Sequence, residues 1–399
     1  MTQEFIFRQK YFDKVRPYID TELIKVFVGQ RRVGKSFLMY QVINYVKENF
    51  DEANIIYINK ELSEFDKITN YTELEDFIKS KTDHKRKNFV FIDEVQLIEQ
   101  FEKALKSLFA QRVYDIYITG SNANLLSGEL ATLLSGRYIE VKVFPLDYKE
   151  FLLFHNLLDT RESLDKYLKF GGLPYLRNLK LTDEIVFDYL QSVYQAILYK
   201  DVIARYNVRN VNFLDRLIRF LANNIGSPVS ARSISKYLKS QNLSIALSTI
   251  LDYLDFFYNA FLVNKVSRID IVGKQIFSVG EKFYFTDIGI RNAIAGFSPF
   301  EMNKIIENVV FCHLLGQGYK VYVGKLKDYE IDFVAEKRGE VSYYQVALRL
   351  DTEETVKREF GNLLKIKDNY PKYLITLDEY EGRSYEGIVH LPLRKFLLK

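Results

Sequence analysis

The segment GQRRVGKS, from Gly29 to Ser36, has the residue types and the spacing of a phosphate-binding loop. It fits the P-loop pattern G-x-x-x-x-G-K-[ST], whose glycines allow a tight turn with backbone N–H groups facing an anion. Lys35 would reach the outer phosphates, and Ser36 would ligate Mg²⁺ while opening a helix whose positive dipole end points at phosphate. An apolar run before the segment and a helical pattern after it favour this reading over an ordinary glycine turn.

Two adjacent acids, Asp93 and Glu94, follow the apolar run FVFI and could complete the phosphate chemistry. Asp93 would hold the Mg²⁺ of Ser36 through water, and Glu94 could polarise an attacking water. Acids after a strand are more often loop charges, but their place downstream of a P-loop favours the catalytic interpretation. The predicted cofactors are ATP and Mg²⁺. The predicted metal ligands are Ser36 and Asp93, and the predicted cofactor contacts are Gly29, Gln30, Arg31, Arg32, Val33, Gly34, Lys35, Ser36 and Phe37.

Two later segments carry further polar candidates. The strand pattern DIYITG leads into Ser121 and Asn122, one of which could touch the γ-phosphate or the attacking water as a sensor. A cap for the following helix is the alternative, and one residue can serve both roles. Arg137 stands directly before a fifth strand pattern and could neutralise transition-state charge, within the chain or across a subunit boundary. A surface ion pair is an equally good explanation of Arg137.

Strand and helix patterns alternate over the first part of the chain, as an α/β domain requires. Strand patterns lie at ANIIYINKE and NFVFIDEVQ, with a helical stretch from about Tyr71 to Lys81 between them. The next helical pattern is QFEKALKSLFAQ. In an open sheet of this kind a nucleotide binds at the carboxyl ends of the strands, where the candidate residues stand.

Composition sets the class of protein. The chain has 399 residues, 48% hydrophobic and 27% charged, which is typical of two or three globular domains. Its one cysteine, Cys312, excludes an internal disulfide and suits a reducing compartment. No apolar run of about 18 residues could span a bilayer, and no signal peptide is evident. We therefore expect a cytoplasmic protein without membrane contact.

Charge is unevenly distributed along the chain. The net charge is +4, but the segment from Lys200 to Arg291 has thirteen Lys and Arg against seven Asp and Glu, or +6. Such a basic middle is an electrostatic footprint that could fit nucleic acid. The four His and one Cys are scattered without the spacing of a zinc site.

Five segments, in order, carry a family resemblance: GQRRVGKS, FVFIDEVQ, ITGSNANLL, SGRYIEVKVFPLDYKEF and FGGLPYL. The chain resembles the prokaryotic AAA-type P-loop ATPases that have a C-terminal domain of unknown function. For residues 1–150 the resemblance implies an additional-strand ATPase core with five parallel strands and helices on both faces. For residues 151–210 it implies a helical lid, on which Lys200, Asp201 and Arg205 could touch the nucleotide or a neighbouring subunit. An exposed i,i+4 charge ladder is the favoured alternative for these three.

Residues 211–295 have the element order of a winged helix-turn-helix. The pattern predicts a helix, a short helix from about Ala231 to Lys239, a turn at Gln241 to Leu243, a longer helix from Ser244 to Asn259 and two strands. The longer helix contains Asp252 and Asp255 but no Lys or Arg, which argues against direct base reading. Contacts to double-stranded DNA would have to come from Arg232, Lys236, Lys239, Lys265, Arg268 and Lys274. Packing or contact with a protein partner is the alternative.

Residues 296–399 resemble the PD-(D/E)XK nuclease fold. Glu307 and Asp332 match its acids, but Gln345 and Ala347 stand where the motif has E-x-K. Gln cannot supply the second anionic ligand, Ala cannot act as the lysine, and Arg349 is a poor substitute. The expectation is a catalytically degenerate domain. For the whole chain we predict an ATPase that uses the nucleotide as a switch; the alternative is a DNA-binding regulator or defence module. The sequence does not distinguish a monomer from a homo-oligomer.

Overall fold

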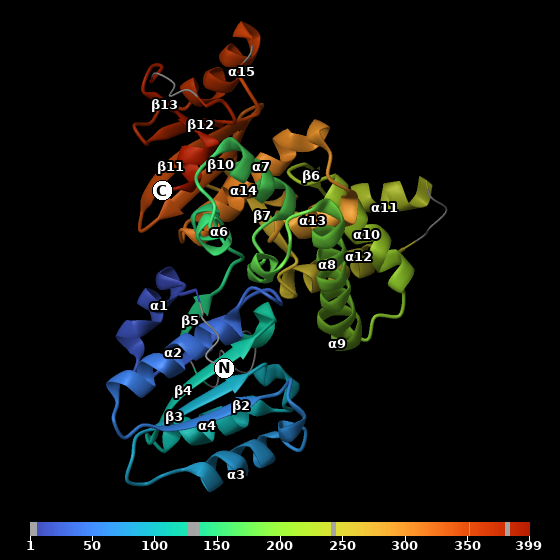
Figure 1. Cartoon of the computed structure of the whole chain (residues 1–399). Helices are drawn as coiled ribbons and strands as arrows, with labels where there is room; N and C mark the ends of the chain where they lie inside the picture. Colours follow the sequence, from blue (N-terminus) through green and yellow to red (C-terminus); the bar gives the residue numbers. More distant parts are fainter. Residues whose placement is uncertain (1–5, 127–133, 135, 241–244, 351, 380–383) are drawn as a thin grey trace. The chain divides into compact units, whose positions relative to one another are not determined.

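The computed structural model describes residues 6–126, 134, 136–240, 245–350, 352–379 and 384–399 (Figure 1). The chain divides into two compact units. The first comprises Met1–Phe144 with Asn259–Phe261, and the second comprises Pro145–Tyr258 with Leu262–Lys399. The predicted turn at 241–243 lies outside the described residues.

The first unit contains a parallel sheet of five strands in the order β2-β3-β4-β1-β5, which confirms the predicted fold class of this part. The strands are β1 (Ile24–Val28), β2 (Asn54–Asn59), β3 (Asn88–Asp93), β4 (Tyr114–Gly120) and β5 (Tyr138–Lys142). β1 and β3 are buried throughout, as expected for strands covered on both faces.

Helices cover both faces of this sheet (Figure 1). They are α1 (Gln9–Val15), α2 (Lys35–Asn49), α3 (Tyr71–Lys81) and α4 (Phe101–Ala110). The connection through α2 crosses the sheet in the opposite direction to those through α3 and α4. Right-handed crossovers therefore place α2 on one face and α3 with α4 on the other.

The apolar core of the first unit lies mainly between the sheet and its helices. Ile24, Val90 and Leu105 are fully buried in it. Phe261, which follows α12 (Leu247–Asn259), also belongs to this core and is 6% exposed. Its backbone is left-handed (φ 54°), and the ammonium of Lys142 lies 5.4 Å from its ring centroid.

The second unit begins with helices and ends with a mixed sheet. The earlier helices are α6 (Tyr148–His155), α7 (Arg161–Phe170), α8 (Asp183–Ala196), the π-helix η6 (Ile197–Ile203), α9 (Ala204–Tyr206), α10 (Val211–Asn223) and α11 (Ala231–Ser240), which α12 follows. Later helices are α13 (Ile288–Ala295), α14 (Met302–Gly316), α15 (Glu353–Leu364) and α16 (Leu393–Leu397).

Eight strands form the sheet of the second unit, in the order β13-β12-β11-β10-β9-β7-β8-β6. They are β6 (Pro228–Val229), β7 (Val263–Asp270), β8 (Ile276–Phe285), β9 (Lys320–Leu326), β10 (Tyr329–Lys337), β11 (Glu340–Ala347), β12 (Lys372–Thr376) and β13 (Ile388–Pro392). The hairpin β7–β8 belongs to the predicted winged segment, yet β7 pairs in parallel with β9. One sheet thus runs across the predicted boundary near residue 295.

Among the described residues, no helix is long and apolar enough to cross a membrane.

Candidate functional site

The P-loop connects β1 to α2, and two of its glycines are required by its geometry. A Cβ atom on Gly29 would lie 2.2 Å from the carbonyl oxygen of Val143, so the backbone directly after β5 leaves no room for a side chain. Gly34 caps α2 with a left-handed backbone (φ 93°), which glycine adopts without strain. The first turn of α2 therefore starts at Lys35, with its N–H groups at the carboxyl edge of the sheet.

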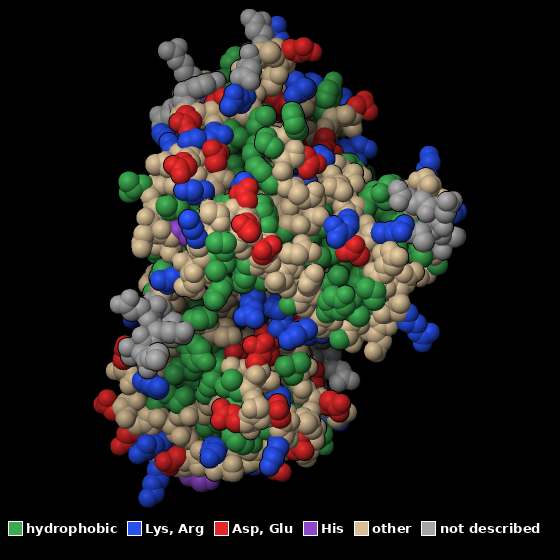
Figure 2. Space-filling view, turned by 45° about the vertical axis from the view of Figure 1, so that its right-hand side comes forward, with side chains coloured by type: hydrophobic (Ala, Val, Ile, Leu, Met, Phe, Trp, Pro, Cys, Tyr) green, Lys and Arg blue, Asp and Glu red, His purple; other side chains and the backbone are tan. Residues whose placement is uncertain are grey.

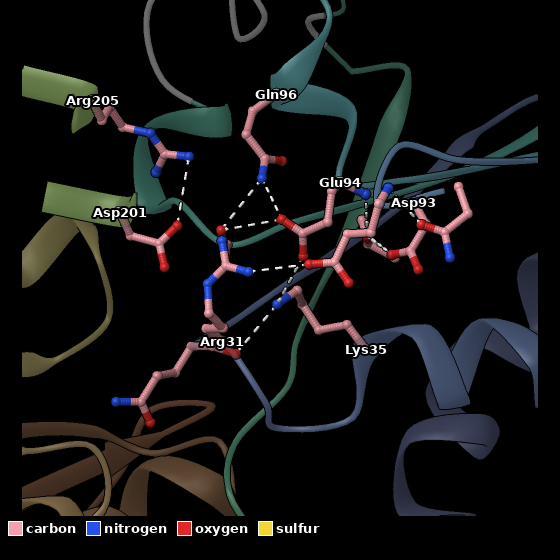
Figure 3. Close-up of polar contacts among 12 residues, drawn as sticks. Arg31, Lys35, Asp93, Glu94, Gln96, Asp201 and Arg205 are labelled. Atoms are coloured by element: carbon pink, nitrogen blue, oxygen red, sulfur yellow. Dashed lines mark hydrogen bonds and ion pairs between the residues drawn. The ribbon is translucent and has the colours of Figure 1, made fainter. Parts of the chain in front are cut away.

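The ammonium of Lys35 lies inside this loop (Figure 3). It donates to the carbonyl oxygens of Gly29 at 3.1 Å and Gln30 at 3.2 Å. It also lies 3.7 Å from Glu94 Oε1, and the lysine is 5% exposed. The buried ammonium of Lys35 therefore connects the P-loop to Glu94, the residue after β3.

Asp93 ends β3 and is 2% exposed. Its carboxylate accepts hydrogen bonds from the hydroxyls of Ser36 and Thr119. Burial raises the pKa of Asp93, and these two hydrogen bonds oppose that shift. A hydroxyl and a carboxylate in contact are hard oxygen ligands, so Ser36 and Asp93 fit a Mg²⁺ ion that also binds phosphate oxygens.

Glu94 stands at a sharp turn after β3, with a left-handed backbone (φ 57°, ψ 50°). Its Oε2 accepts from the amide of Gln96 and from Ser121 Oγ, the latter at 3.3 Å (Figure 3). Burial raises the pKa of Glu94, but the charges of Lys35 and Arg31 and the hydrogen bonds from Gln96 and Ser121 together lower it below the ordinary value. Glu94 is thus held as an ionised carboxylate at neutral pH.

Sequence reasoning missed three residues at this edge of the sheet. Thr119 donates to Asp93 and accepts from the Glu94 amide at 2.9 Å. Gln96 donates to both Glu94 and Ser121, the latter at 3.3 Å. Glu61, after β2, lies 3.2 Å from Arg31. Only Thr119 had a signal, because it ends the same strand pattern as the predicted sensor.

The other residues predicted to contact the nucleotide differ in how far they are buried. Gln30 and Val33 are fully buried, whereas Arg32 is exposed. Phe37 is 48% exposed, and its ring meets that of Tyr40 edge to face at 6.3 Å. In the first unit the arrangement brings together Arg31, Lys35, Ser36, Asp93, Glu94 and Ser121.

Arg137 does not join them. It precedes β5, and β5 runs parallel to β1 with Ile24 opposite Tyr138 and Val28 opposite Lys142. Arg137 therefore lies at the amino edge of the sheet, while the P-loop leaves the carboxyl edge. Its guanidinium lies 5.6 Å from the ring centroid of Phe109. A phosphate contact from Arg137 within the same site is not supported by this placement.

The predicted exposed charge ladder of the lid segment needs correction. Lys200 is exposed, but the side chain of Asp201 is only 2% exposed and that of Arg205 is 20% exposed. Their ion pair spans 3.9 Å (Figure 3). Asp201, in the π-helix η6, pairs with Arg205 at the expected i,i+4 spacing, so the correction concerns exposure: the pair is largely buried.

A second charged cluster lies in the second unit. Lys282 Nζ, on β8, is 3.1 Å from Glu307 Oε1 and 2.8 Å from Glu330 Oε1. Tyr284 donates to Glu307 at 2.6 Å, and the Val346 amide donates to Asp332 at 2.7 Å. Burial raises the pKa of Asp332, and the charge of Glu307 adds to that shift. The sequence did not indicate that a lysine of β8 reaches these acids.

The residues that stand in place of the nuclease motif, Gln345, Ala347 and Arg349, do not share one environment. Gln345 Oε1 accepts from the Asp332 amide at 3.4 Å, while Arg349 is exposed and Ala347 is buried. Across the described part of the chain, no group of three or more His, Cys, Asp and Glu side chains could hold a metal ion on its own.

The parallel sheet, the P-loop and the two acids after β3 define a P-loop protein with an AAA-type first unit. Residues 21–152 match the family model described as an AAA domain, and residues 161–301 match a domain of unknown function. The chain belongs to the same family as an uncharacterized protein of Haemophilus influenzae, to which it is 38% identical over 408 residues with both chains covered in full. It is also 32% identical over 330 residues to an uncharacterized protein of Methanocaldococcus jannaschii, covering 78% of this chain and 71% of the other.

Solved structures with partial similarity include the Aeropyrum pernix ORC1 protein in complex with DNA. It is 11% identical, with 73% of this chain and 92% of that chain covered and a TM-score of 0.32. AMPPCP-bound DnaA from Aquifex aeolicus is 15% identical, with 63% and 88% covered and a TM-score of 0.31. At scores this low, the similarity supports no conclusion about this chain.

Proposed function

We propose that this protein binds ATP with Mg²⁺ and hydrolyses it, and that the bound nucleotide sets the conformational state of the chain. The observation that carries the proposal is the setting of Glu94. Its carboxylate lies 3.7 Å from the P-loop lysine and accepts hydrogen bonds from Gln96 and Ser121. A buried, ionised acid beside a P-loop lysine is suited to polarise a water molecule next to the γ-phosphate.

Each residue of the site has a separate proposed role in ATP hydrolysis. Backbone N–H groups of the P-loop and the Lys35 ammonium bind the phosphates. Glu94 accepts the proton of a water whose oxygen attacks the γ-phosphorus, and the bond to the bridging oxygen breaks to give ADP and phosphate. Ser36 and Asp93 would hold Mg²⁺, which when bound neutralises charge on the phosphate oxygens. Ser121, bonded to Glu94, is the proposed sensor of the γ-phosphate.

Two substitutions separate binding from turnover. Lys35→Ala should abolish tight nucleotide binding, because the buried cation is lost. Glu94→Gln should keep nucleotide affinity and lower the hydrolysis rate roughly 10²-fold or more, because an amide cannot accept the proton. Affinity for a fluorescent ATP analogue and steady-state phosphate release are the measurements. Hydrolysis by Glu94→Gln at the wild-type rate would show that Glu94 is not the base.

A second candidate function, association with double-stranded DNA, rests on α11. This helix has Arg232, Lys236 and Lys239 on its surface and no acidic residue. Figure 2 shows Lys and Arg side chains on the lobe at the right of the view, where α11 lies. Two of the three predicted wing cations form ion pairs: Lys265 lies 3.2 Å from Glu281 and Arg268 lies 3.3 Å from Glu330. The third, Lys274, is a single exposed cation, whereas α11 has three on one helix. We therefore assign the proposed phosphate contacts to α11.

The DNA proposal is tested with the full chain at low salt. Replacing Arg232, Lys236 and Lys239 together by Ala should weaken retention of duplex DNA and lower the salt slope of log K by up to about 3. The matched control replaces the exposed Lys81, Lys85 and Arg86 of the first unit and should leave retention unchanged. Equal effects of the two triple variants, or no binding by the wild type, would contradict a DNA role. In that case a pull-down with Glu94→Gln and ATP would search for a protein partner.

For residues 296–399 we propose a nuclease-like domain without nuclease activity. Lys282 forms ion pairs with Glu307, one of the two acids that match the nuclease motif, and with Glu330, and Gln345 adds no charge. Plasmid DNA incubated with the protein and Mg²⁺ or Mn²⁺ should stay intact. Nicking that disappears in Asp332→Ala would refute this.

A further inference from the structure

Arg31 is the first of two adjacent arginines in the P-loop, and the two face different ways. Its side chain is 13% exposed, and its Nη1 lies 3.2 Å from Oε1 of Glu61, which follows β2. Arg32 is exposed and has a left-handed backbone (φ 71°). The loop therefore directs Arg31 along the carboxyl edge of the sheet and leaves Arg32 at the surface.

The guanidinium of Arg31 lies on the side of the site where the acid that would polarise water stands: Figure 3 shows Arg31, Lys35 and Glu94 near one another. Glu61 and Glu94 follow neighbouring strands, since Asn59 of β2 pairs with Asp93 of β3. Arg31 thus lies between two acids at the edge where the phosphates would bind, on the same side as Lys35 (Figure 3).

We propose that Arg31 contacts the γ-phosphate of ATP in the site of its own chain and neutralises the charge that builds up during hydrolysis. This inference rests on the proposed ATPase function and goes beyond it by assigning the arginine. Between turnovers Glu61 is the counter-ion that keeps the guanidinium oriented, and the phosphate oxygens replace Glu61 when ATP binds. A guanidinium carries five donors in a planar fork, which matches phosphate geometry.

The position of Arg137 supports this assignment. Arg137 lies at the amino edge of the sheet, so the chain cannot bring it to its own phosphates without breaking the pairing of β5 with β1. Arg31 needs no such rearrangement, because the P-loop already holds it against Glu61 at the carboxyl edge of the sheet, where Glu94 also stands. The chain would therefore hydrolyse ATP without an arginine from a second copy.

The experiment compares Arg31→Ala, Arg31→Lys and Glu61→Gln with the wild type. Arg31→Ala should lower kcat on the order of 10³-fold, the scale of an arginine that stabilises phosphoryl transfer. Its affinity for ADP, which lacks the γ-phosphate, should stay within about threefold. Arg31→Lys should give an intermediate kcat, since it keeps the charge and loses the fork. Glu61→Gln should change kcat by less than about tenfold, because Glu61 orients Arg31 and does not touch the phosphate.

Arg86→Ala is the matched control. Arg86 precedes β3 at the amino edge of the same sheet, and its side chain is 53% exposed and lies 3.4 Å from Asp83. It should keep the wild-type kcat and ADP affinity. If Arg31→Ala does not fold, Arg31→Lys carries the test alone: a kcat equal to that of the wild type would overturn the proposal. Loss of ADP affinity as large as the loss of kcat would also overturn it, since Arg31 would then only shape the loop.

Dilution of the protein tests whether one chain hydrolyses ATP without a group from a second copy. The hydrolysis rate per chain should stay constant over a 100-fold dilution, and a fall would mean that a second copy supplies a group. Failure of the underlying function has a different signature: a wild type that neither binds nucleotide nor releases phosphate overturns both proposals. A wild type that hydrolyses ATP alongside a fully active Arg31→Ala overturns only this one.

Discussion

At the scale of single residues, Thr119 fixes both acids of the candidate site. Strands β3 and β4 pair with Ile92 opposite Ile118, which places Thr119 beside Asp93. Its fully buried hydroxyl donates to Asp93 and accepts from the Glu94 amide. One side chain thus sets the direction of the proposed metal ligand and the turn that carries the proposed base.

Replacing this hydroxyl should affect both stability and rate. Thr119→Val keeps the shape but leaves the Glu94 amide and one Asp93 oxygen without their partner, at a cost of about 1–3 kcal/mol in the free energy of unfolding. The hydrolysis rate should fall as well, because Glu94 loses its support. Urea unfolding and phosphate release are the measurements. Thr119→Ser keeps the hydroxyl and is the control; if Val and Ser behave alike, the hydrogen bonds do not matter.

The residue types of the site could be read from the sequence, but not how the side chains meet. The P-loop and the two acids after β3 follow fixed patterns, so Lys35, Asp93 and Glu94 could be predicted. Gln96 could not, because its return to Glu94 depends on the left-handed turn at Glu94. The position of Arg137 depends on the register of β5 with β1, which is a long-range pairing that local patterns do not contain.

At the scale of elements, Asp287 joins the start of α13 to the glycine turn after α7. Its carboxylate accepts from the Gly172 amide at 2.8 Å and from the Ile290 amide at 2.9 Å. Burial raises the pKa of Asp287 to about 6, although these hydrogen bonds oppose the shift. The ordinary pKa of Asp is about 3.9, so between these values the folded state holds a proton that the unfolded chain has released.

Stability should therefore fall as pH rises through this window. The contribution of Asp287 is largest below about pH 4, decreases by about 3 kcal/mol up to pH 6 and is level above it. Asp287→Asn has no charge to lose, so the stability advantage of the wild type over this variant should shrink by that amount from pH 4 to pH 7. Urea unfolding of both proteins across this range measures it. A pH-independent difference would contradict the raised pKa.

Elements with local signals were predicted well. The predicted helix from Tyr71 to Lys81 is α3, where Asn70 and Glu73 form a capping box that is visible in the sequence. The winged segment was harder. Its helices and strands follow the predicted order, but the parallel pairing of β7 with β9 joins residues far apart in the chain. No local pattern encodes that pairing, so the sequence suggested a boundary inside a continuous sheet.

At the scale of the whole molecule, the chain has two compact units where the sequence suggested four segments. The end of the first segment, predicted at residue 150, lies close to the observed change of unit after Phe144. Apart from Asn259–Phe261, the lid, winged and nuclease-like segments fall within the second unit, and their separate identities stay predictions. Composition indicates how many apolar residues can form cores. It does not show that a residue late in the chain packs into the core of the N-terminal unit.

Phe261 is such a residue, and its position has a consequence for folding during translation. Its ring is part of the first unit's core, and an absent Phe typically costs about 3–5 kcal/mol. A ribosome releases the chain from the N-terminus, so a nascent chain ending at Phe144 has every strand of the five-stranded parallel sheet but lacks this ring. The P-loop unit can complete its core only after α6 to α12 have been synthesised. Its maturation is therefore tied to the translation of the second unit, whereas most domains fold as soon as they emerge.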